Sequence, residues 1–185
     1  MRTDSLKKSM QKGFTLVELL IVVIILAILA AIVVPQFSAS TDDAKVSSLK
    51  STLAGIRSAL DIYYQQHSHY PSFVAATGTA ACAAGTPGAG AINTAAAFTE
   101  QMTTYTRADG AACTQKNGTP TVPVFSMGPY LKQAVPADPI TGTVSTITVV
   151  TTGDLAMIAD GTAGGWKYDN KTGRFIMNHT DYDDL

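Results

Sequence analysis

The chain has 185 residues, of which 46% are hydrophobic and only 15% are charged. That length suits one modest domain with an additional segment, and so little charge is unusual for a freely soluble protein. The net charge of −1 divides into +3 on residues 1–13 and −4 on the remainder. A mildly acidic remainder excludes a general nucleic-acid binder, because neutralising phosphates takes clustered Lys and Arg, so no nucleic acid is expected as a partner.

Near the N-terminus, residues 16–34 form an apolar run, LVELLIVVIILAILAAIVV, whose sole polar member is Glu18. A helix of this length spans roughly 28 Å, close to the hydrocarbon thickness of a bilayer. Basic residues precede the run and few follow it closely, which predicts a cytoplasmic leader and an external C-terminus.

Two simpler interpretations compete for this segment. A secretory signal peptide fits poorly, because the run exceeds the usual apolar core and Pro35-Gln36-Phe37 follows it in place of a small-x-small cleavage site. A plain membrane anchor leaves Glu18 unexplained, since a carboxylate inside an apolar span is costly and usually has a partner.

The segment KGFTLVE at residues 12–18 resembles the processing site of type IV prepilins and type II secretion pseudopilins, and the similarity continues to Pro35. The resemblance implies that a prepilin peptidase cuts between Gly13 and Phe14 and methylates the new Phe14 amine. It also implies that Glu18 pairs with the Phe14 ammonium of a neighbouring subunit in a homo-oligomeric helical filament, built on an inner-membrane assembly platform. Such a cut leaves the apolar anchor on the mature chain.

A second helix pattern follows Pro35, which we expect to end or kink the apolar helix because it lacks an N–H. The pattern should stop before Pro71, and the charged residues Lys50, Arg57 and Asp61 fall away from its apolar stripe. Packing of the stripe against a sheet is expected, and a coiled coil, for which it is short, is the alternative. The stripe consists of Val46, Leu49, Leu53, Ile56, Leu60 and Tyr63.

His67 and His69 near the end of this helix raise the question of a metal site. Two histidines two positions apart do not share a helix face, and no third ligand lies nearby in the sequence. We therefore expect a solvated helix terminus rather than a metal centre.

Residues 74–123 are rich in Ala, Gly and Thr and have few large apolar residues. This composition predicts a long connection whose ordering costs conformational entropy. Cys82 and Cys113 would close a loop of about 30 residues, worth on the order of 3.5 kcal/mol in the chain-entropy model. A disulfide is expected and two free thiols are the alternative. Neither cysteine has an activating neighbour that would indicate catalysis.

The C-terminal region favours short strands at residues 144–150, 154–159, 165–169 and 173–177. The predicted fold class is α+β, a pilin-like fold in which a long N-terminal helix, half transmembrane and half amphipathic, packs on a small antiparallel sheet. The expected segments are a cytoplasmic leader (1–13), a transmembrane and assembly helix (14–35), an amphipathic helix (36–70), a variable loop region (71–127) and a sheet region (128–185).

The C-terminus gathers Asp181, Asp183 and Asp184, and major pseudopilins bind calcium with a C-terminal loop. Oxygen ligands suit that ion, so a calcium site is one hypothesis and a solvated acidic tail is the other. No other cofactor is expected. No phosphate-binding loop, nucleophile elbow or metal-ligand motif is present in the sequence, so we do not expect an enzyme.

Pseudopilus and type IV pilus are the two machines that the resemblance leaves open. Residues 128–132 and 135–139 resemble the loop before the sheet in major pseudopilins, whereas residues 140–142 lack the Trp-Gly usual there. The long variable region and the expected disulfide favour a type IV pilin. We expect a subunit of a type II secretion pseudopilus, made in the bacterial inner membrane with a periplasmic C-terminus and moved into a periplasmic pseudopilus, or alternatively into a cell-surface pilus.

Overall fold

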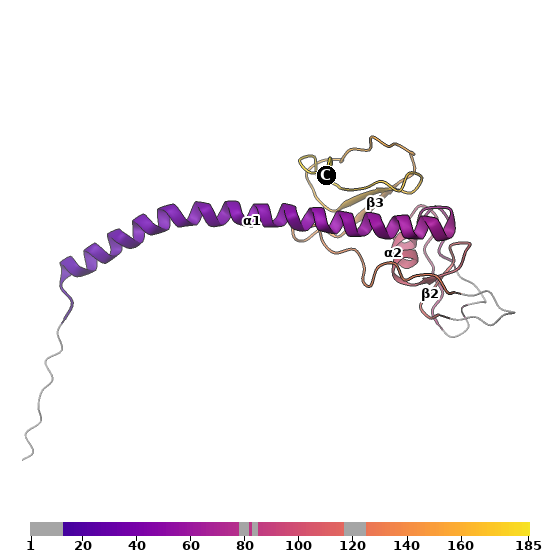
Figure 1. Ribbon diagram of the computed structural model, residues 1–185, viewed down its shortest axis with the longest axis horizontal. Coiled ribbons are helices and arrows are strands. Elements are labelled where there is room, and N and C mark those ends of the chain that lie inside the picture. The colour runs from indigo at the N-terminus through magenta and orange to yellow at the C-terminus, as the bar shows by residue number, and fades with distance from the viewer. Residues whose placement is uncertain (1–12, 78–81, 83–84, 117–124) are drawn as a thin grey trace, which may run out of the picture. The chain divides into compact units, whose positions relative to one another are not determined.

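The computed structural model describes residues 13–77, 82, 85–116 and 125–185. It divides into two compact units, Met1–Asp43 and Ala44–Leu185. Helix α1 (Leu16–His67) contributes its first half to one unit and its second half to the other (Figure 1). The expected leader lies outside the described residues, except for Gly13 at its end.

We expected Pro35 to end or kink the helix. Helix α1 continues through position 35, so the expected end was wrong, while a kink at Pro35 stays a prediction. A proline removes one backbone hydrogen bond and crowds the turn before it. In a helix of 52 residues that loss is a small part of the hydrogen-bond ladder, and the turns on both sides keep their own bonds. The helix does stop before Pro71, at His67, as the sequence predicted.

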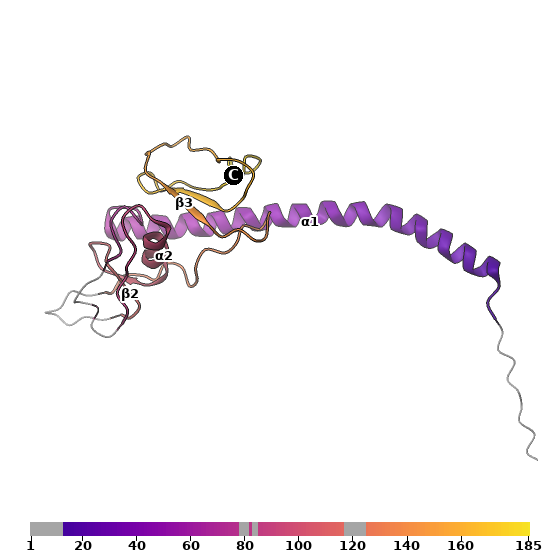
Figure 2. The ribbon, with the colours of Figure 1, turned by 180° about the vertical axis from the view of Figure 1, so that it is seen from behind.

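The second half of α1 buries the predicted apolar stripe. Leu49, Leu53 and Tyr63 are all inaccessible to solvent, and they share one core cluster with Trp166 and Phe175 of the C-terminal sheet. Both views of the ribbon show the sheet beside this half of the helix (Figures 1 and 2). The expected packing of a helix stripe against a sheet is therefore confirmed.

Three strands form the C-terminal sheet in the order β3-β4-β5, with bounds β3 (Ile147–Val150), β4 (Trp166–Asp169) and β5 (Phe175–Met177). Strands β4 and β5 pair antiparallel, with Trp166 opposite Met177, whereas β3 and β4 pair parallel, with Ile147 opposite Trp166. The α+β class is confirmed, but the sheet is mixed rather than purely antiparallel.

The strand predicted at residues 154–159 is absent, and this segment belongs to the connection between β3 and β4. Parallel neighbours cannot be joined by a tight hairpin and need a crossover of about a dozen residues or more. Residues 151–165 supply that crossover, which places Leu155 and Ile158 on the surface while Met157 is buried. Within this segment Met157 and Ala159 are buried, but the segment forms a loop and not a strand.

The middle of the chain contains a helix that the sequence analysis treated as loop, α2 (Ala95–Thr103). The Thr94 hydroxyl caps it by accepting the N–H of Ala97 at 3.2 Å. Phe98 and Met102, four positions apart, are fully buried in the main core beside α1. A short antiparallel pair, β1 (Tyr105–Thr106) and β2 (Ala112–Cys113), follows.

A buried aspartate joins the loop before the sheet to the start of β4. The Asp138 carboxylate accepts the backbone N–H groups of Thr141 at 2.7 Å and of Gly165 at 2.9 Å. Burial alone would raise the pKa of Asp138, but its hydrogen bonds outweigh that effect and hold the pKa below its usual value. The indole N–H of Trp166 donates to the carbonyl of Pro136 at 2.8 Å, which fixes the same loop a second time.

Candidate processing and assembly site

The Gly13–Phe14 bond precedes the first turn of α1, and both residues are exposed. Phe14 has 83% of its surface accessible to solvent. A side chain at position 13 would meet no described atom within 4 Å, so nothing described crowds this bond. The predicted cleavage position therefore lies in an open, non-helical segment.

Glu18 takes part in a hydrogen-bonded cap that the sequence analysis missed. Its Oε2 accepts the backbone N–H of Thr15 at 2.9 Å and the Thr15 hydroxyl at 2.7 Å, while the Glu18 N–H lies 3.2 Å from Thr15 Oγ1. This reciprocal arrangement is the capping box, in which Thr at the cap and Glu three positions later satisfy free donors at a helix start. The Thr-x-x-Glu spacing could have predicted it.

The cap opens a helix segment that is apolar on every side. Leu16–Val34 comprises 19 residues with a mean hydropathy of 3.4, long and apolar enough by length and composition to cross a membrane. None of this span is buried within the described chain. An all-round apolar helix needs an apolar environment along its whole length, in lipid or against other helices.

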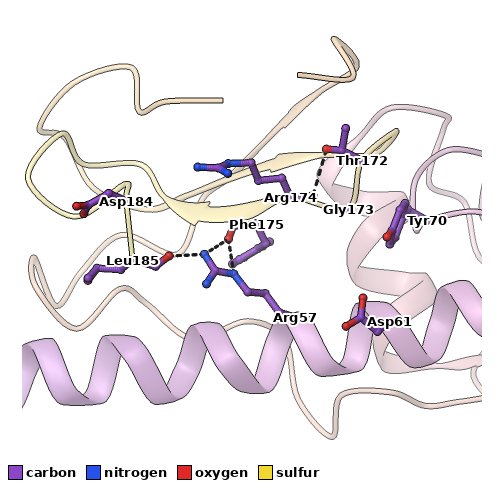
Figure 3. A pocket seen from close by; sticks show the side chains of 9 residues that line it. All are labelled: Arg57, Asp61, Tyr70, Thr172, Gly173, Arg174, Phe175, Asp184 and Leu185. Atoms are coloured by element: carbon purple, nitrogen blue, oxygen red, sulfur yellow. Dashed lines mark hydrogen bonds between the residues drawn. The ribbon is translucent and has the colours of Figure 1, made fainter. Parts of the chain in front are cut away.

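In the second unit, an open pocket of about 450 Å³ lies between α1 and β5, with Arg57 at its centre (Figure 3). The Arg57 guanidinium donates to the carbonyl oxygen of Phe175 at 2.9 Å and to a main-chain oxygen of Leu185 at 2.5 Å. Burial, followed by the nearby charge of Arg174, lowers the pKa of Arg57. Arg57 thus ties the helix to the sheet and the C-terminal segment, a role the stripe pattern did not suggest.

The two cysteines are joined in the structure. Cys82 and Cys113 form a disulfide across 31 positions of sequence, as expected, and both are buried in a small cluster with Ala111 and Phe125. This cluster is separate from the main core. The bond therefore fastens a part of the variable region that has little apolar packing of its own.

The C-terminal aspartates do not come together. Asp183 accepts the N–H of Ala159 at 2.7 Å, Asp184 lines the Arg57 pocket, and Asp181 lies 3.9 Å from the ring of His179. Over the described residues, which include this whole tail, no group of three or more His, Cys, Asp or Glu side chains is placed to hold a metal ion. This arrangement does not support the calcium site.

His67 is not at a solvated helix terminus, and that expectation was wrong. Its ring is buried and stacks on Tyr63 with 4.0 Å between ring centroids. Its Nε2 lies 2.9 Å from the Thr106 hydroxyl and 3.0 Å from the Tyr130 hydroxyl. The residues that cover His67 come from β1 and from the connection between β2 and β3, which the sequence pattern of α1 could not reveal.

Comparisons with known proteins agree with the N-terminal features. The family described as prokaryotic N-terminal methylation motif matches residues 8–34. A type II secretion system core protein G of Pseudomonas aeruginosa is 46% identical over 67 residues, covering 36% of this chain and 47% of that protein. A fimbrial protein of Neisseria meningitidis serogroup A is 42% identical over 72 residues, covering 39% of this chain and 42% of that protein.

A core protein G of Klebsiella michiganensis is 37% identical over 67 residues, with the same coverage as the Pseudomonas protein. The chain thus spans less than half the length of these curated relatives. No solved structure matches it significantly. A methylation-type N-terminus, an apolar helix and a small α+β unit fit a pilin-like fold. Over 36% to 39% of its length, the chain is similar to a type II secretion system core protein G and to a fimbrial protein.

Proposed function

We propose that the protein is a structural subunit of a pilin-like filament of the type II secretion pseudopilus kind. It is made as a prepilin, cut after Gly13 and methylated on Phe14. The observation that carries the proposal is the junction at the start of α1, where an open Gly13–Phe14 bond stands directly before a capped and wholly exposed apolar helix. Cleavage there removes the basic leader and retains the anchor.

The hydrogen bonds of the Glu18 carboxylate support a role for this residue in assembly. Both hydrogen bonds from Thr15 reach Oε2, and within the described residues Oε1 accepts none. One oxygen is therefore held in place while the other remains open to a second donor. The ammonium of Phe14 on a neighbouring subunit is such a donor, and pairing the two charges would remove the cost of each in an apolar filament core.

The exposed apolar helix supports a homo-oligomeric filament. In the membrane, lipid covers Leu16–Val34, and outside the membrane the same surface needs other helices of its kind. The proposed partners are therefore further copies of the chain, a prepilin peptidase that acts at the membrane and an inner-membrane assembly platform. The precursor would lie with its leader in the cytoplasm and its C-terminus in the periplasm. We propose no catalytic role for it.

A type IV pilus subunit is the second candidate, because the disulfide stabilises a long variable region and a fimbrial protein is among the relatives. The core protein G of Pseudomonas aeruginosa matches at somewhat higher identity, which favours the pseudopilus. The two machines are distinguished by whether the subunit is found in long surface fibres or is needed for the release of secreted proteins.

Mass spectrometry of the protein from its own cells tests the processing step. We expect a mature chain that begins at N-methylated Phe14. Gly13→Val should accumulate as the full precursor, whereas Gly55→Val should be cut normally; a Cβ at either glycine meets nothing within 4 Å. A mature wild-type chain that retains residues 1–13, or that starts beyond Pro35, would contradict the proposal.

A further inference from the structure

The C-terminal sheet has β5 at one outer edge and β3 at the other, and the two edges differ. In β5, the Arg174 carbonyl accepts the N–H of Asp169 in β4, so the main-chain groups of the next residue, Phe175, point outward. Arg57 closes this edge, because its Nε and Nη2 both donate to the Phe175 carbonyl, at 3.0 and 2.9 Å (Figure 3). The β5 edge therefore has a partner within the chain.

The β3 edge lacks such a partner. The Trp166 N–H donates to the Thr146 carbonyl at 2.9 Å, and Ile147 lies opposite Trp166 in the parallel pair. In a parallel ladder this pattern directs every second residue of β3 towards β4 and leaves the N–H and C=O groups of Ile147 and Val149 pointing away. Within the described part of the chain, no hydrogen bond reaches these outward groups.

The unpaired groups indicate an edge that is open to water, since buried main-chain N–H and C=O groups almost always have partners. Residues 144–151 all keep some exposed surface except Ile147, whose side chain lies in the core. Helix α2 packs Phe98 on Tyr168, on the core side of the sheet, and among the described residues no hydrogen bond joins α2 to β3.

The sequence of this edge also lacks the features that usually protect one. Native proteins place lysine, proline or a bulge on an edge strand to prevent it from pairing with another chain. Residues 141–153 contain neither a charged residue nor a proline, and most of them are Thr or Val. Such β-branched residues favour strands. The β3 edge is thus unpaired, unprotected and suited to a further strand.

We propose that β3 is a docking edge, to which an extended, uncharged segment of a different protein adds as a further strand of the sheet. The outward N–H and C=O groups repeat about every 6.6 Å along β3. The main chain of another strand carries acceptors and donors at the same repeat, which a compact small molecule does not. Val149 is only partly buried at the rim of the core, so an apolar side chain is expected beside it on the added strand.

A second copy of this chain fits the edge less well, a step that rests on the proposed helical filament. Identical edges pair across a two-fold axis, whereas successive subunits of a helical filament make heterologous contacts. Pairing of β3 with β5 of a neighbour is opposed by Arg57, which already bonds the outward carbonyl of Phe175. The added strand is therefore expected from another protein.

Hydrogen exchange of backbone amides, followed by NMR on the full chain in lipid nanodiscs, tests the inference. In the free protein the amides of Ile147 and Val149 should exchange about tenfold faster than those of Thr148 and Val150, which face β4. The probe is a synthetic peptide of alternating Thr and Val with a Lys at each end. It should slow exchange at Ile147 and Val149 about tenfold, and the same peptide N-methylated at its central residues should not.

Variants of the edge supply the controls. Val149→Pro removes an outward N–H and leaves the bonds between β3 and β4, so the peptide should no longer slow exchange at Ile147. Ser145→Pro, at an exposed position on the same side just before β3, should weaken the effect without touching the core. Thr148→Ala keeps all main-chain donors and should respond to the peptide as the wild type does.

Equal protection of Ile147 and Thr148 in the free protein would mean that the edge is covered and would overturn the inference. So would exchange that the peptide leaves unchanged, or equal slowing by the N-methylated peptide. Slowing that grows with protein concentration in the absence of peptide would assign the edge to a second copy and would equally reject a different protein. A chain that binds the peptide but builds no filament in electron micrographs would contradict the proposed function and not the docking edge.

Discussion

The two halves of α1 differ in what covers their apolar side chains. Leu26 in the first half is 59% exposed, whereas Leu53 in the second half is 1% exposed. The residue type is the same and the helix is continuous, so hydrophobicity alone does not decide burial within the chain. The second half carries one apolar stripe that the sheet covers, and the first half is apolar all round. Its partners must come from outside the chain.

Matched leucine substitutions should show this difference as the largest effect on stability. Leu53→Ala removes a buried side chain and leaves a cavity, so the free energy of unfolding should fall by about 2–5 kcal/mol. Leu26→Ala should change it by less than about 0.5 kcal/mol, because that side chain is 59% exposed and belongs to the Met1–Asp43 unit. Fluorescence of Trp166, the single tryptophan and fully buried, reports the unfolding in denaturant.

If the two substitutions lower the free energy of unfolding equally, the apolar side chains in the first half of α1 would stabilise the fold as much as those in the second half. That result would contradict the difference in their burial. The wild-type chain in detergent micelles serves as the reference for both variants, so that the environment of the apolar half is constant throughout the series.

The main core and the small cluster around Cys82 and Cys113 are separate, and the disulfide lies in the small cluster. Replacing both cysteines by alanine should lower the free energy of unfolding by about 2–4 kcal/mol, because a loop of about 30 residues regains its freedom in the unfolded chain. Non-reducing peptide mapping should recover the two cysteines linked. Complete alkylation of both thiols without prior reduction would contradict the linkage in the native protein.

Acid should weaken the second unit through His67. Burial lowers the pKa of His67 to about 4, against an ordinary value of about 6.5. The folded protein therefore holds fewer protons than the unfolded chain between those values. The contribution of His67 to the free energy of unfolding is therefore fully present above about pH 6.5 and is lost as the pH falls towards 4.

Urea titrations at several pH values measure this slope, and His67→Gln, which cannot titrate, should remove most of it. Asp138 acts in a lower window, because its pKa lies below the usual value and its contribution is lost only as the pH falls further. An unchanged slope in His67→Gln would assign the effect to other groups.

The sequence predicted what depends on local pattern. The apolar run, the buried stripe from Leu49 to Tyr63 and the β4–β5 pair all follow from spacing along short segments. The helix α2 could also have been found, since Thr94 is a typical cap and Phe98 and Met102 are four positions apart. The abundance of Ala and Gly around it obscured a pattern that was present.

What the sequence could not show depends on contacts between distant segments. His67 is buried by Thr106 and Tyr130, and Arg57 bonds main-chain oxygens more than a hundred positions away. The parallel pairing of β3 with β4 turns the apolar residues near Met157 into a crossover loop. At the candidate site, the motif identified Gly13, Phe14 and Glu18, and the local Thr15-x-x-Glu18 spacing could also have predicted the cap that the structure shows.

We propose that Glu18 serves assembly and not the folding of the Ala44–Leu185 unit. The direct test compares filament abundance by electron microscopy for Glu18→Val and Thr15→Val, each in a strain that makes no wild-type subunit. Both changes break the hydrogen bond from the Thr15 hydroxyl to the Glu18 carboxylate, but only Glu18→Val removes the carboxylate. We predict that Glu18→Val abolishes or sharply reduces filaments, that Thr15→Val retains them, and that Trp166 reports normal folding in both. Normal filaments at normal abundance from Glu18→Val would contradict the claim.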